Sequence, residues 1–356
     1  MFNKLKEFFG GATLSLFVTM VLVFLFMYLL NGGKYVDLYN IRSMASQLPI
    51  IGFLAVGMMF AMLTGGINLA IVSNANLNGL VICVALSWLT GSESLVRNDM
   101  KSASVFQVVL AIAAGIVISV LIGVFHGVMV AWLRIPALLV TLGTMTFIIG
   151  VNEAVTRGYT ISGFPAHLTR IGTDNLKGVL ASWGVDFPWA IPIPMILFIL
   201  SCIVAWLLLN RTRFGFSLYM MGANETAAKF SGVNIMKITV IQYVVSALFA
   251  SLTSLVMIGQ LNSIKANYYE SYVLVAVLAC FLGGVDPNGG FGRLASVIIA
   301  TFILQFISSG FNLMRMDPYM VTAMWGGIVL ILIFGRAILS YTRRKLRRRT
   351  PESGAA

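Results

Sequence analysis

The chain has few charged residues. Only 10% of its 356 residues are Asp, Glu, Lys or Arg, while 59% are hydrophobic. A soluble globular domain carries about 25% charged residues, so this composition excludes an ordinary water-soluble protein. A helix that crosses the hydrocarbon core of a bilayer needs about 20 residues, so the chain has room for about ten crossings and for no separate catalytic domain.

Acidic residues are half as numerous as basic ones, of which the chain has 24. The chain has 12 Asp and Glu residues, and each of them lies in a predicted loop or at the end of an apolar segment. Carriers that are driven by ions or protons usually keep ionisable groups at membrane depth, where those groups bind the coupling ion. We therefore expect the energy for any uphill transport to come from outside this chain.

The residues needed for covalent or metal chemistry are also few. The 3 cysteines lie in apolar stretches without a CxxC pair, and the 2 histidines have no companion ligands, so neither a disulfide framework nor a metal site follows. No GxxxxGK(S/T) loop and no Ser/His/Asp or Cys/His set is present. We expect no catalysis by this chain and no cofactor bound to it.

Long apolar runs are what the sequence does have. They predict an all-α polytopic membrane protein with about ten transmembrane segments, some of them discontinuous. In chain order the segments are 12–31, 48–64, 67–90, 105–132, 137–152, 190–209, 238–259, 271–284, 293–312 and 320–340. Segment 67–90 begins with a polar run and 271–284 is too short to cross. Because irregular or polar backbone is tolerated at membrane depth only inside protein or beside a wet cavity, these two segments are candidates for a central pathway.

Basic residues give an orientation. The net charge is +12, and six cations lie between Arg343 and Arg349, directly after the last apolar segment. Cations in this position anchor a helix on the cytoplasmic side, and the absence of a stacking aromatic surface argues against nucleic acid as a partner. We predict a transmembrane domain 1–342 surrounded by lipid, a cytoplasmic loop 210–237, a long extracytoplasmic loop 153–189 and a basic cytoplasmic tail 343–356.

Small residues recur at a helical spacing. Ala111, Gly115, Ser119, Gly123 and Gly127 follow one another every four residues. Such a row lets neighbouring helix backbones approach closely, which supplies packing where lipid removes the usual hydrophobic drive. This pattern predicts a compact bundle and carries no information about a ligand.

The predicted cytoplasmic loop contains a short capped helix. Asn224 is a suitable N-cap, Glu225 would lie in the first turn near the positive helix end, and Gly232 would stop the helix. A helix of this kind could lie in a groove of a partner protein. A simple connecting helix is the alternative interpretation.

Four stretches, in order along the chain, resemble the permease subunits of ribose- and galactose-type ABC importers. The stretch 211–234 (RTRFG to SGVN) is similar to the loop that meets the ATPase subunit in that family. Residues 63–69 (LTGGINL) resemble its TGGIDLS motif, 135–145 (IPALLVTLGTM) its IPxFIVTLGTM motif, and 283–292 its double-glycine turn. The family's usual Asp is Asn68 here, a departure at a position that bears on ligand preference.

The resemblance implies a function and partners. It implies the membrane permease of an ABC importer for a monosaccharide or a similar small neutral solute, in the inner membrane of a bacterium. The implied partners are an ABC ATPase subunit that binds ATP and Mg²⁺, an extracytoplasmic substrate-binding protein, and a second permease copy or a sister subunit. The residues that it places at the ATPase are Asn224, Glu225, Ala227, Ala228, Phe230 and Gly232.

Uncharged polar residues inside the apolar segments are the candidates for the substrate pathway. Such groups suit a neutral polyhydroxylated ligand, which needs donors and acceptors but no counter-ion. Hydrogen bonding between helices is the alternative role for each of them. The candidates are Asn68, Asn74, Asn76, Asn78, Thr141, Thr144, Asn152 and Gln305.

Three other functions remain open at the level of sequence. A nucleoside-type ABC permease of the same family would also carry a mostly neutral, ribose-bearing ligand. A secondary carrier or channel would act without ATP, although the absence of acidic residues at membrane depth argues against it. A membrane-embedded enzyme would need a catalytic set, which the sequence does not offer.

Overall fold

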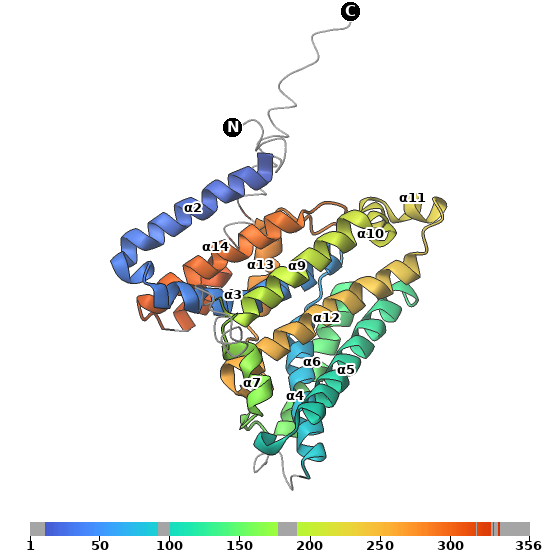
Figure 1. Cartoon of the computed structure of the whole chain (residues 1–356). Helices are drawn as coiled ribbons and strands as arrows, with labels where there is room; N and C mark the ends of the chain where they lie inside the picture. Colours follow the sequence, from blue (N-terminus) through green and yellow to red (C-terminus); the bar gives the residue numbers. More distant parts are fainter. Residues whose placement is uncertain are drawn as a thin grey trace, which may run out of the picture.

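Long apolar helices form most of the molecule (Figure 1). The computed structural model describes residues 11–91, 100–176, 191–317, 319–328, 330 and 334. In this part of the chain, 8 helices are long and apolar enough to cross a membrane. They are α2 (Gly11–Asn31), α3 (Leu38–Met62), α4 (Ile71–Leu89), α5 (Val105–Ala131), α6 (Ala137–Thr156), α9 (Ile193–Arg211), α12 (Ile235–Leu261) and α14 (Leu294–Leu313).

The remaining elements are short. They are η1 (Gly32–Tyr35), η2 (Met100–Ser102), β1 (Ile161–Ser162), α7 (Ala166–Thr173), α10 (Arg213–Ala223), α11 (Glu225–Phe230), β2 (Ser263–Ile264) and the apolar α13 (Tyr272–Leu282). Strands β1 and β2 form one antiparallel pair. Residues 319–328 are helical and begin the predicted segment 320–340. The predicted all-α polytopic membrane protein is confirmed.

Two predictions of segment boundaries need correction. Helix α3 begins ten residues before the predicted segment 48–64, and its polar first turns are tied to the bundle: Ser309 donates a hydrogen bond to the half-buried Asn40 amide oxygen (3.0 Å). Helix α4 is regular through its polar run, and the irregular backbone lies before it, at residues 63–70. Segment 271–284 is as short as predicted, since α13 has 11 residues.

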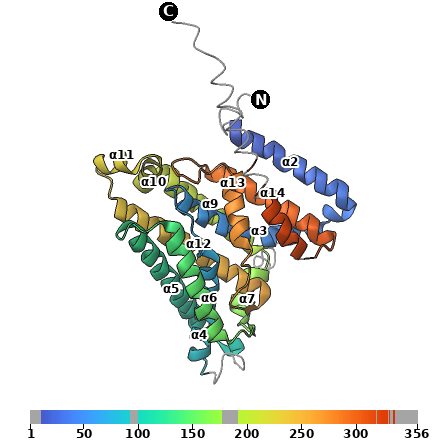
Figure 2. The same cartoon turned by 180° about the vertical axis from the view of Figure 1, so that it is seen from behind.

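Helix α12 lies at the centre of the bundle. It packs against α3, α4, α5 and α7. Figure 1 shows it running from the side of α11 towards α7, and Figure 2 shows it from behind, with α6 in front of it. Its start is fixed by Asn234, whose side-chain oxygen accepts a hydrogen bond from the Lys237 backbone (3.0 Å). It ends at Asn262, which adopts the left-handed conformation that stops a helix.

The interface of α5 with α12 depends on the predicted row of small residues. Added to Gly127, a Cβ atom would lie 2.5 Å from the Val240 Cα, and one added to Gly123 would lie 2.7 Å from the Tyr243 carbonyl oxygen. Gly115, in the same row, faces Ile82 and Asn78 of α4. The row therefore places two helix backbones against α5, and the packing predicted from the spacing is confirmed.

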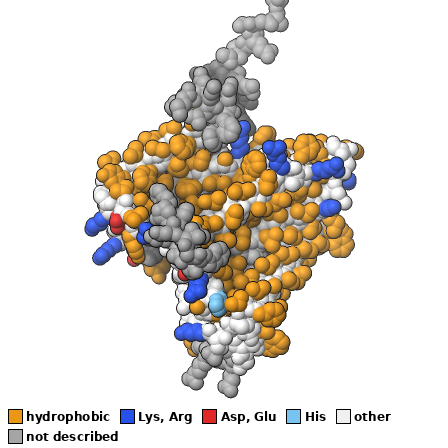
Figure 3. Space-filling view, in the orientation of Figure 1, with side chains coloured by type: hydrophobic (Ala, Val, Ile, Leu, Met, Phe, Trp, Pro, Cys, Tyr) orange, Lys and Arg blue, Asp and Glu red, His pale blue; other side chains and the backbone are white. Residues whose placement is uncertain are grey.

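Helix α2 is a peripheral helix that lies along α14. Its contacts with α14 include a hydrogen bond between the Thr13 and Ser296 hydroxyls (2.9 Å). Directly after α2, the Tyr35 hydroxyl donates to the Phe306 carbonyl oxygen (2.9 Å). Hydrophobic side chains cover much of the face shown in Figure 3, as expected for a surface that meets lipid.

The bundle has two different ends. We call the end that carries α10 and α11 the α11 end; it also includes the links before α4, between α5 and α6, and between α13 and α14. The opposite end carries α7 and the β1–β2 pair. Of the predicted outer loop, residues 177–189 lie outside the described residues, as does the basic tail 343–356.

The contact at Gly127 gives a test of the fold. We expect Gly127→Leu to lower stability by about 1–3 kcal/mol, because the larger side chain must push α12 away from α5. Thermal unfolding of the purified protein in detergent would measure the loss. The control is Gly150→Leu on α6, where an added Cβ atom would meet nothing within 4 Å; equal losses in the two variants would contradict the packing role.

Candidate functional site

The short helix of the predicted cytoplasmic loop forms as expected. The Asn224 side-chain oxygen accepts a hydrogen bond from the Ala227 backbone at 2.9 Å, and Glu225 lies in the first turn. After Ser231 the chain turns at Gly232, which has φ +81°. The caps fix both ends of α11, and Asn234 then begins α12.

Helix α11 presents most of its side chains to solvent. Glu225, Ala227 and Lys229 are exposed, and Phe230 is 89% exposed. Ala228 differs, because its side chain is fully buried in the core of the protein. The described contacts therefore make Ala228 an anchor of α11, and the exposed residues around it are the ones that can meet another protein.

Helix α10 connects α11 to the bundle. The Thr212 hydroxyl caps its start by accepting from the Gly215 backbone (3.3 Å). Near its other end, the Tyr219 hydroxyl donates to the Gly292 carbonyl oxygen (2.9 Å), in the link between α13 and α14. Burial raises the pKa of Tyr219, with the Arg293 charge acting against the shift, so the hydroxyl keeps its proton and remains a donor.

Three segments of the chain meet through glycines next to α11: the end of α10, the link before α4 and the link before α14. We call Gly65, Gly222, Gly289 and Gly290 the glycine junction. A Cβ atom on Gly222 would collide with the Leu63 carbonyl oxygen and with the Gly290 nitrogen. The Gly290 backbone itself donates a hydrogen bond to the Leu63 oxygen (2.8 Å). The loop of α10 and α11 is thus in backbone contact with the links before α4 and before α14.

The geometry of the junction requires glycine at Gly289 as well. Its φ of +93° is unfavourable for other residues. An added Cβ atom would also lie 2.7 Å from the Gly65 nitrogen and 3.0 Å from the Gly222 oxygen. Because these contacts join backbones, the three segments pack directly against one another without intervening side chains.

The polar residues predicted to line a pathway are mostly buried and bonded within the chain. The Asn68 amide donates to the Ser246 hydroxyl (2.9 Å) and the Asn78 amide to the Ser251 hydroxyl (3.0 Å). The Asn74 amide donates to the Ser119 carbonyl oxygen (3.4 Å). These bonds run from α4 and its preceding link to α12 and α5. They match the alternative role of hydrogen bonding between helices, and the pathway role stays a prediction.

Asn76 performs a different task at the opposite end. Its amide donates to the carbonyl oxygens of Ala266 (3.2 Å) and Tyr268 (2.9 Å). These carbonyls belong to the segment between β2 and the short α13, so Asn76 holds an irregular stretch against α4. This is the setting in which irregular backbone is tolerated inside a membrane protein.

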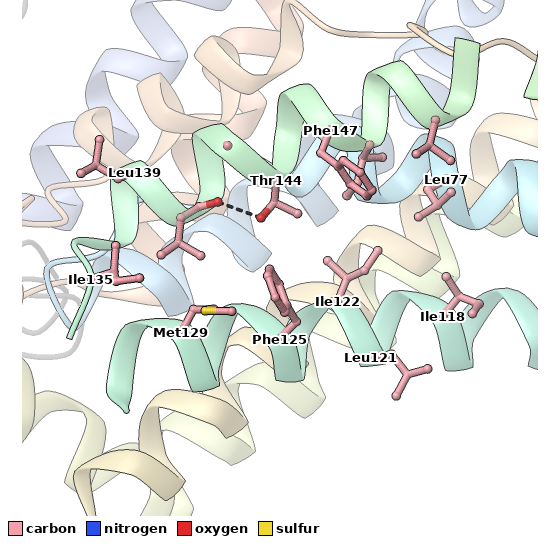
Figure 4. A pocket seen from close by; sticks show the side chains of 14 residues that line it. Leu77, Ile118, Leu121, Ile122, Phe125, Met129, Ile135, Leu139, Thr144 and Phe147 are labelled. Carbon is pink, nitrogen blue, oxygen red and sulfur yellow. Dashed lines mark hydrogen bonds between the residues drawn. The ribbon is translucent and has the colours of Figure 1, made fainter. Parts of the chain in front are cut away.

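The two threonines of α6 bond to backbone. The Thr141 hydroxyl lies 2.9 Å from the Ile67 oxygen and 2.9 Å from the Ala137 oxygen, which ties α6 to the link before α4. The Thr144 hydroxyl donates to the Val140 oxygen at 2.8 Å. Figure 4 shows this bond at the wall of a groove of about 700 Å³ whose other side chains are almost all apolar. That groove between α5 and α6 offers a sugar little to bond with.

Asn152 and Gln305 complete the predicted set. Asn152 is fully buried on α6, and neither polar atom of its amide has a partner among the described residues. The Gln305 amide donates to the Gln47 oxygen (3.4 Å), between α14 and α3. The structure thus distributes the predicted residues over several helix interfaces.

Comparison with known proteins identifies the family. Residues 40–334 match the family described as "Branched-chain amino acid transport system / permease component". The chain belongs to this family. The ribose import permease protein RbsC of Escherichia coli K12 is 30% identical over 302 residues, which cover 84% of this chain and 86% of that protein.

Other permeases of this family are similar over most of their length. The galactose/methyl galactoside import permease protein MglC of Salmonella typhimurium is 27% identical over 96% of each chain. The autoinducer 2 import system permease protein LsrC of Escherichia coli SMS-3-5 is 28% identical over 93% of this chain and 90% of that protein. No solved structure matches the chain. The resemblance inferred from four motifs is confirmed, and the chain is a membrane permease.

Sequence reasoning found the motifs of the junction but missed their contact. Residues 63–69, 211–234 and 283–292 are separate matches in the sequence, which assigns Gly290 only to a turn and Gly222 to no site. The glycines that recur in all three stretches are the feature of the sequence that could have indicated a close backbone contact. What the sequence could not show is that these glycines touch, because the stretches are far apart in the chain.

The junction gives a second test. Gly222→Ala places a methyl group against the Leu63 oxygen, so we expect α10 and α11 to be displaced. The free energy of their local opening should fall by about 1–3 kcal/mol. Tryptic cleavage after the exposed Lys229 should accelerate about tenfold, since cleavage follows the population of the open form. Gly33→Ala, with free space at its Cβ position, is the control; unchanged cleavage in Gly222→Ala would show that the junction does not hold α11.

Proposed function

We propose that the chain is the permease subunit of an ABC importer that translocates a monosaccharide or a similar small neutral solute. The observation that carries this proposal is α11, an exposed capped helix joined by backbone contacts to the links before α4 and α14. Support for the class of solute comes from relatives named for the import of ribose and galactose. The described residues at membrane depth are also nearly free of acidic side chains.

The α11 end faces the cytoplasm in this proposal, and the protein resides in the bacterial inner membrane. ATPase subunits bind there, where Glu225 and Lys229 offer one charge of each sign and Phe230 offers an exposed aromatic ring. Exposed aromatic residues are typical anchors of protein interfaces. ATP and Mg²⁺ belong to those subunits, and the permease binds no cofactor of its own.

The opposite end receives the solute from an extracytoplasmic binding protein. The described part of the long loop 153–189 offers Tyr159, which is 61% exposed, next to a β1–β2 pair that fixes the loop against the end of α12. A second permease copy or a sister subunit completes the pathway. Helix α6 is the candidate contact, since only a small share of it is buried in this chain.

ATP binding and hydrolysis change the permease only if the ATPase holds one of its conformations more tightly than another. The structure supplies the means for this difference. A shift of α11 acts on the link before α4 and the link before α14 through the glycine junction, because these links are in backbone contact with Gly222. The permease itself carries out no covalent step.

Purification of the tagged permease from its native membrane tests this proposal. We expect an ATP-binding-cassette subunit to copurify with the wild-type protein and to be reduced about tenfold or more with Phe230→Ala, because truncation of an anchoring aromatic residue removes about 2 kcal/mol or more of binding energy. Mass spectrometry with labelled standards would quantify the ratio. Glu225→Lys, which reverses an exposed charge of α11, should reduce it as well.

Phe106→Ala provides the matched control, because Phe106 is 77% exposed and lies at the start of α5, at the opposite end. Recovery of the permease without any ATPase, together with uptake that persists when ATP is depleted, would contradict the proposal and favour an ATP-independent carrier. A copurifying binding protein can be screened with sugars and nucleosides, and a preference for nucleosides would establish the nucleoside-type permease instead.

A further inference from the structure

A polar cavity of about 670 Å³ opens at the α11 end of the protein. Its walls are α11, the beginning of α12, the link between α5 and α6, and the turn at residues 64–66. It differs from the groove between α5 and α6 because much of its lining is polar. Its volume lies within the range of about 300–1,000 Å³ that is usual for small-molecule sites.

Two buried side chains of the wall have polar atoms without partners. The Gln242 amide nitrogen donates to the Thr64 hydroxyl (2.7 Å), which leaves its amide oxygen without a partner among the described residues. The neighbouring Tyr243 is fully buried, and its hydroxyl is also unpartnered in the described part of the chain. Gln242 is 1% exposed. An unsatisfied buried polar atom costs about 1–3 kcal/mol, so these two atoms, on consecutive residues of α12, mark a place where a water molecule or a solute can bond.

The Tyr243 hydroxyl is enclosed beneath the wall of the cavity. It lies over Gly66, where an added Cβ atom would come within 2.8 Å of it. The ring packs edge-on against His126 at a centroid distance of 5.8 Å. Gly66 and Tyr243 both line the cavity, so a small shift of the turn at residues 64–66 would bring the hydroxyl into contact with a bound molecule.

The arrangement of charge favours a neutral ligand. The deep residues Thr64, Gln242 and Tyr243 are uncharged, while the charged lining residues Arg134, Glu225 and Lys229 are exposed at the mouth. A charged ligand in the deep part would lose its hydration without a counter-ion. A hydroxyl group can donate to the free Gln242 oxygen, and another can donate to or accept from Tyr243.

We propose that this cavity is a binding site for a neutral polyhydroxylated solute of monosaccharide size on the cytoplasmic, release side of the permease. Gln242 and Tyr243 bind its hydroxyl groups. Helix α11 is one wall, so the segment at which the ATPase is proposed to bind also controls access to this site. The assignment of the solute class and of the side rests on the proposed function; the cavity and its unpartnered atoms do not.

Chemical labelling at the mouth of the cavity tests the assignment. Thr226 is exposed and lines the cavity, so Thr226→Cys places a thiol there. Inside-out membrane vesicles that contain the complete transporter are treated with a membrane-impermeant maleimide, with and without D-ribose or D-galactose. Cys83 and Cys280 are buried and Cys202 lies within the membrane helix α9, and the wild-type protein measures any background labelling.

We expect one of the two sugars to slow the labelling about tenfold at ten times its dissociation constant, as simple occupancy requires. Tyr243→Phe, made in the Thr226→Cys protein, should weaken the apparent affinity about fivefold, which corresponds to one lost hydrogen bond. The same change should not lower thermal stability in the absence of sugar, because the hydroxyl has no partner among the described residues that would be lost. Gln242→Leu should also weaken protection.

Gln260→Leu is the matched control, since Gln260 lies on the same helix at the opposite end and bonds to the Ser46 carbonyl oxygen. Absence of protection by both sugars, or protection that is equally strong in Tyr243→Phe and Gln242→Leu, would overturn the assignment and leave a cavity that holds water only. Protection that persists while uptake is independent of ATP would instead overturn the proposed importer and leave the site intact. The two proposals therefore fail in different experiments.

Discussion

Close approach of backbones at glycine is the constraint on which this structure depends. Lipid removes the hydrophobic drive between membrane helices, so their association relies on van der Waals attraction, which falls by about a quarter to a half when surfaces separate by about 0.5–1 Å. Gly123 and Gly127 bring α5 against the backbone of α12. Because α12 also packs against α3, α4 and α7, the position of these helices follows from that contact.

Polar side chains determine the orientation of the packed helices relative to one another. Asn68, Asn74 and Asn78 each donate one hydrogen bond to α5 or α12, which fixes the rotation of α4 and of its preceding link. Their amide oxygens remain unpartnered among the described residues. An unpaired buried amide oxygen is costly, so these interfaces gain free energy in any conformation that supplies the oxygen with a partner.

The sequence predicts the parts of this protein better than their assembly. Hydrophobic runs locate the helices, the four-residue spacing of Gly115, Gly123 and Gly127 predicts a close interface, and Asn224 and Gly232 predict the ends of α11, since each of these depends on nearby residues alone. The burial of Ala228 and the meeting of Gly65, Gly222 and Gly290 depend on segments that are distant in the chain. For Asn74 and Asn78 the residue type indicates hydrogen bonding, but only the direction of the side chain distinguishes a bond to a neighbouring helix from a bond to a solute.

The kind of contact at the glycine junction determines what it can transmit. A long side chain placed between α11 and the bundle would absorb a displacement by changing its rotamer. Gly222, Gly289 and Gly290 remove that freedom, because backbone there touches backbone. A movement of α11 therefore reaches the helices that the two links join, at the ends of α3, α4, α13 and α14.

The same movement changes the wall of the cavity that contains Gln242 and Tyr243. Force on α11 and the shape of the cavity are thus coupled through one small set of contacts, and a solute in the cavity must in turn bias the position of α11.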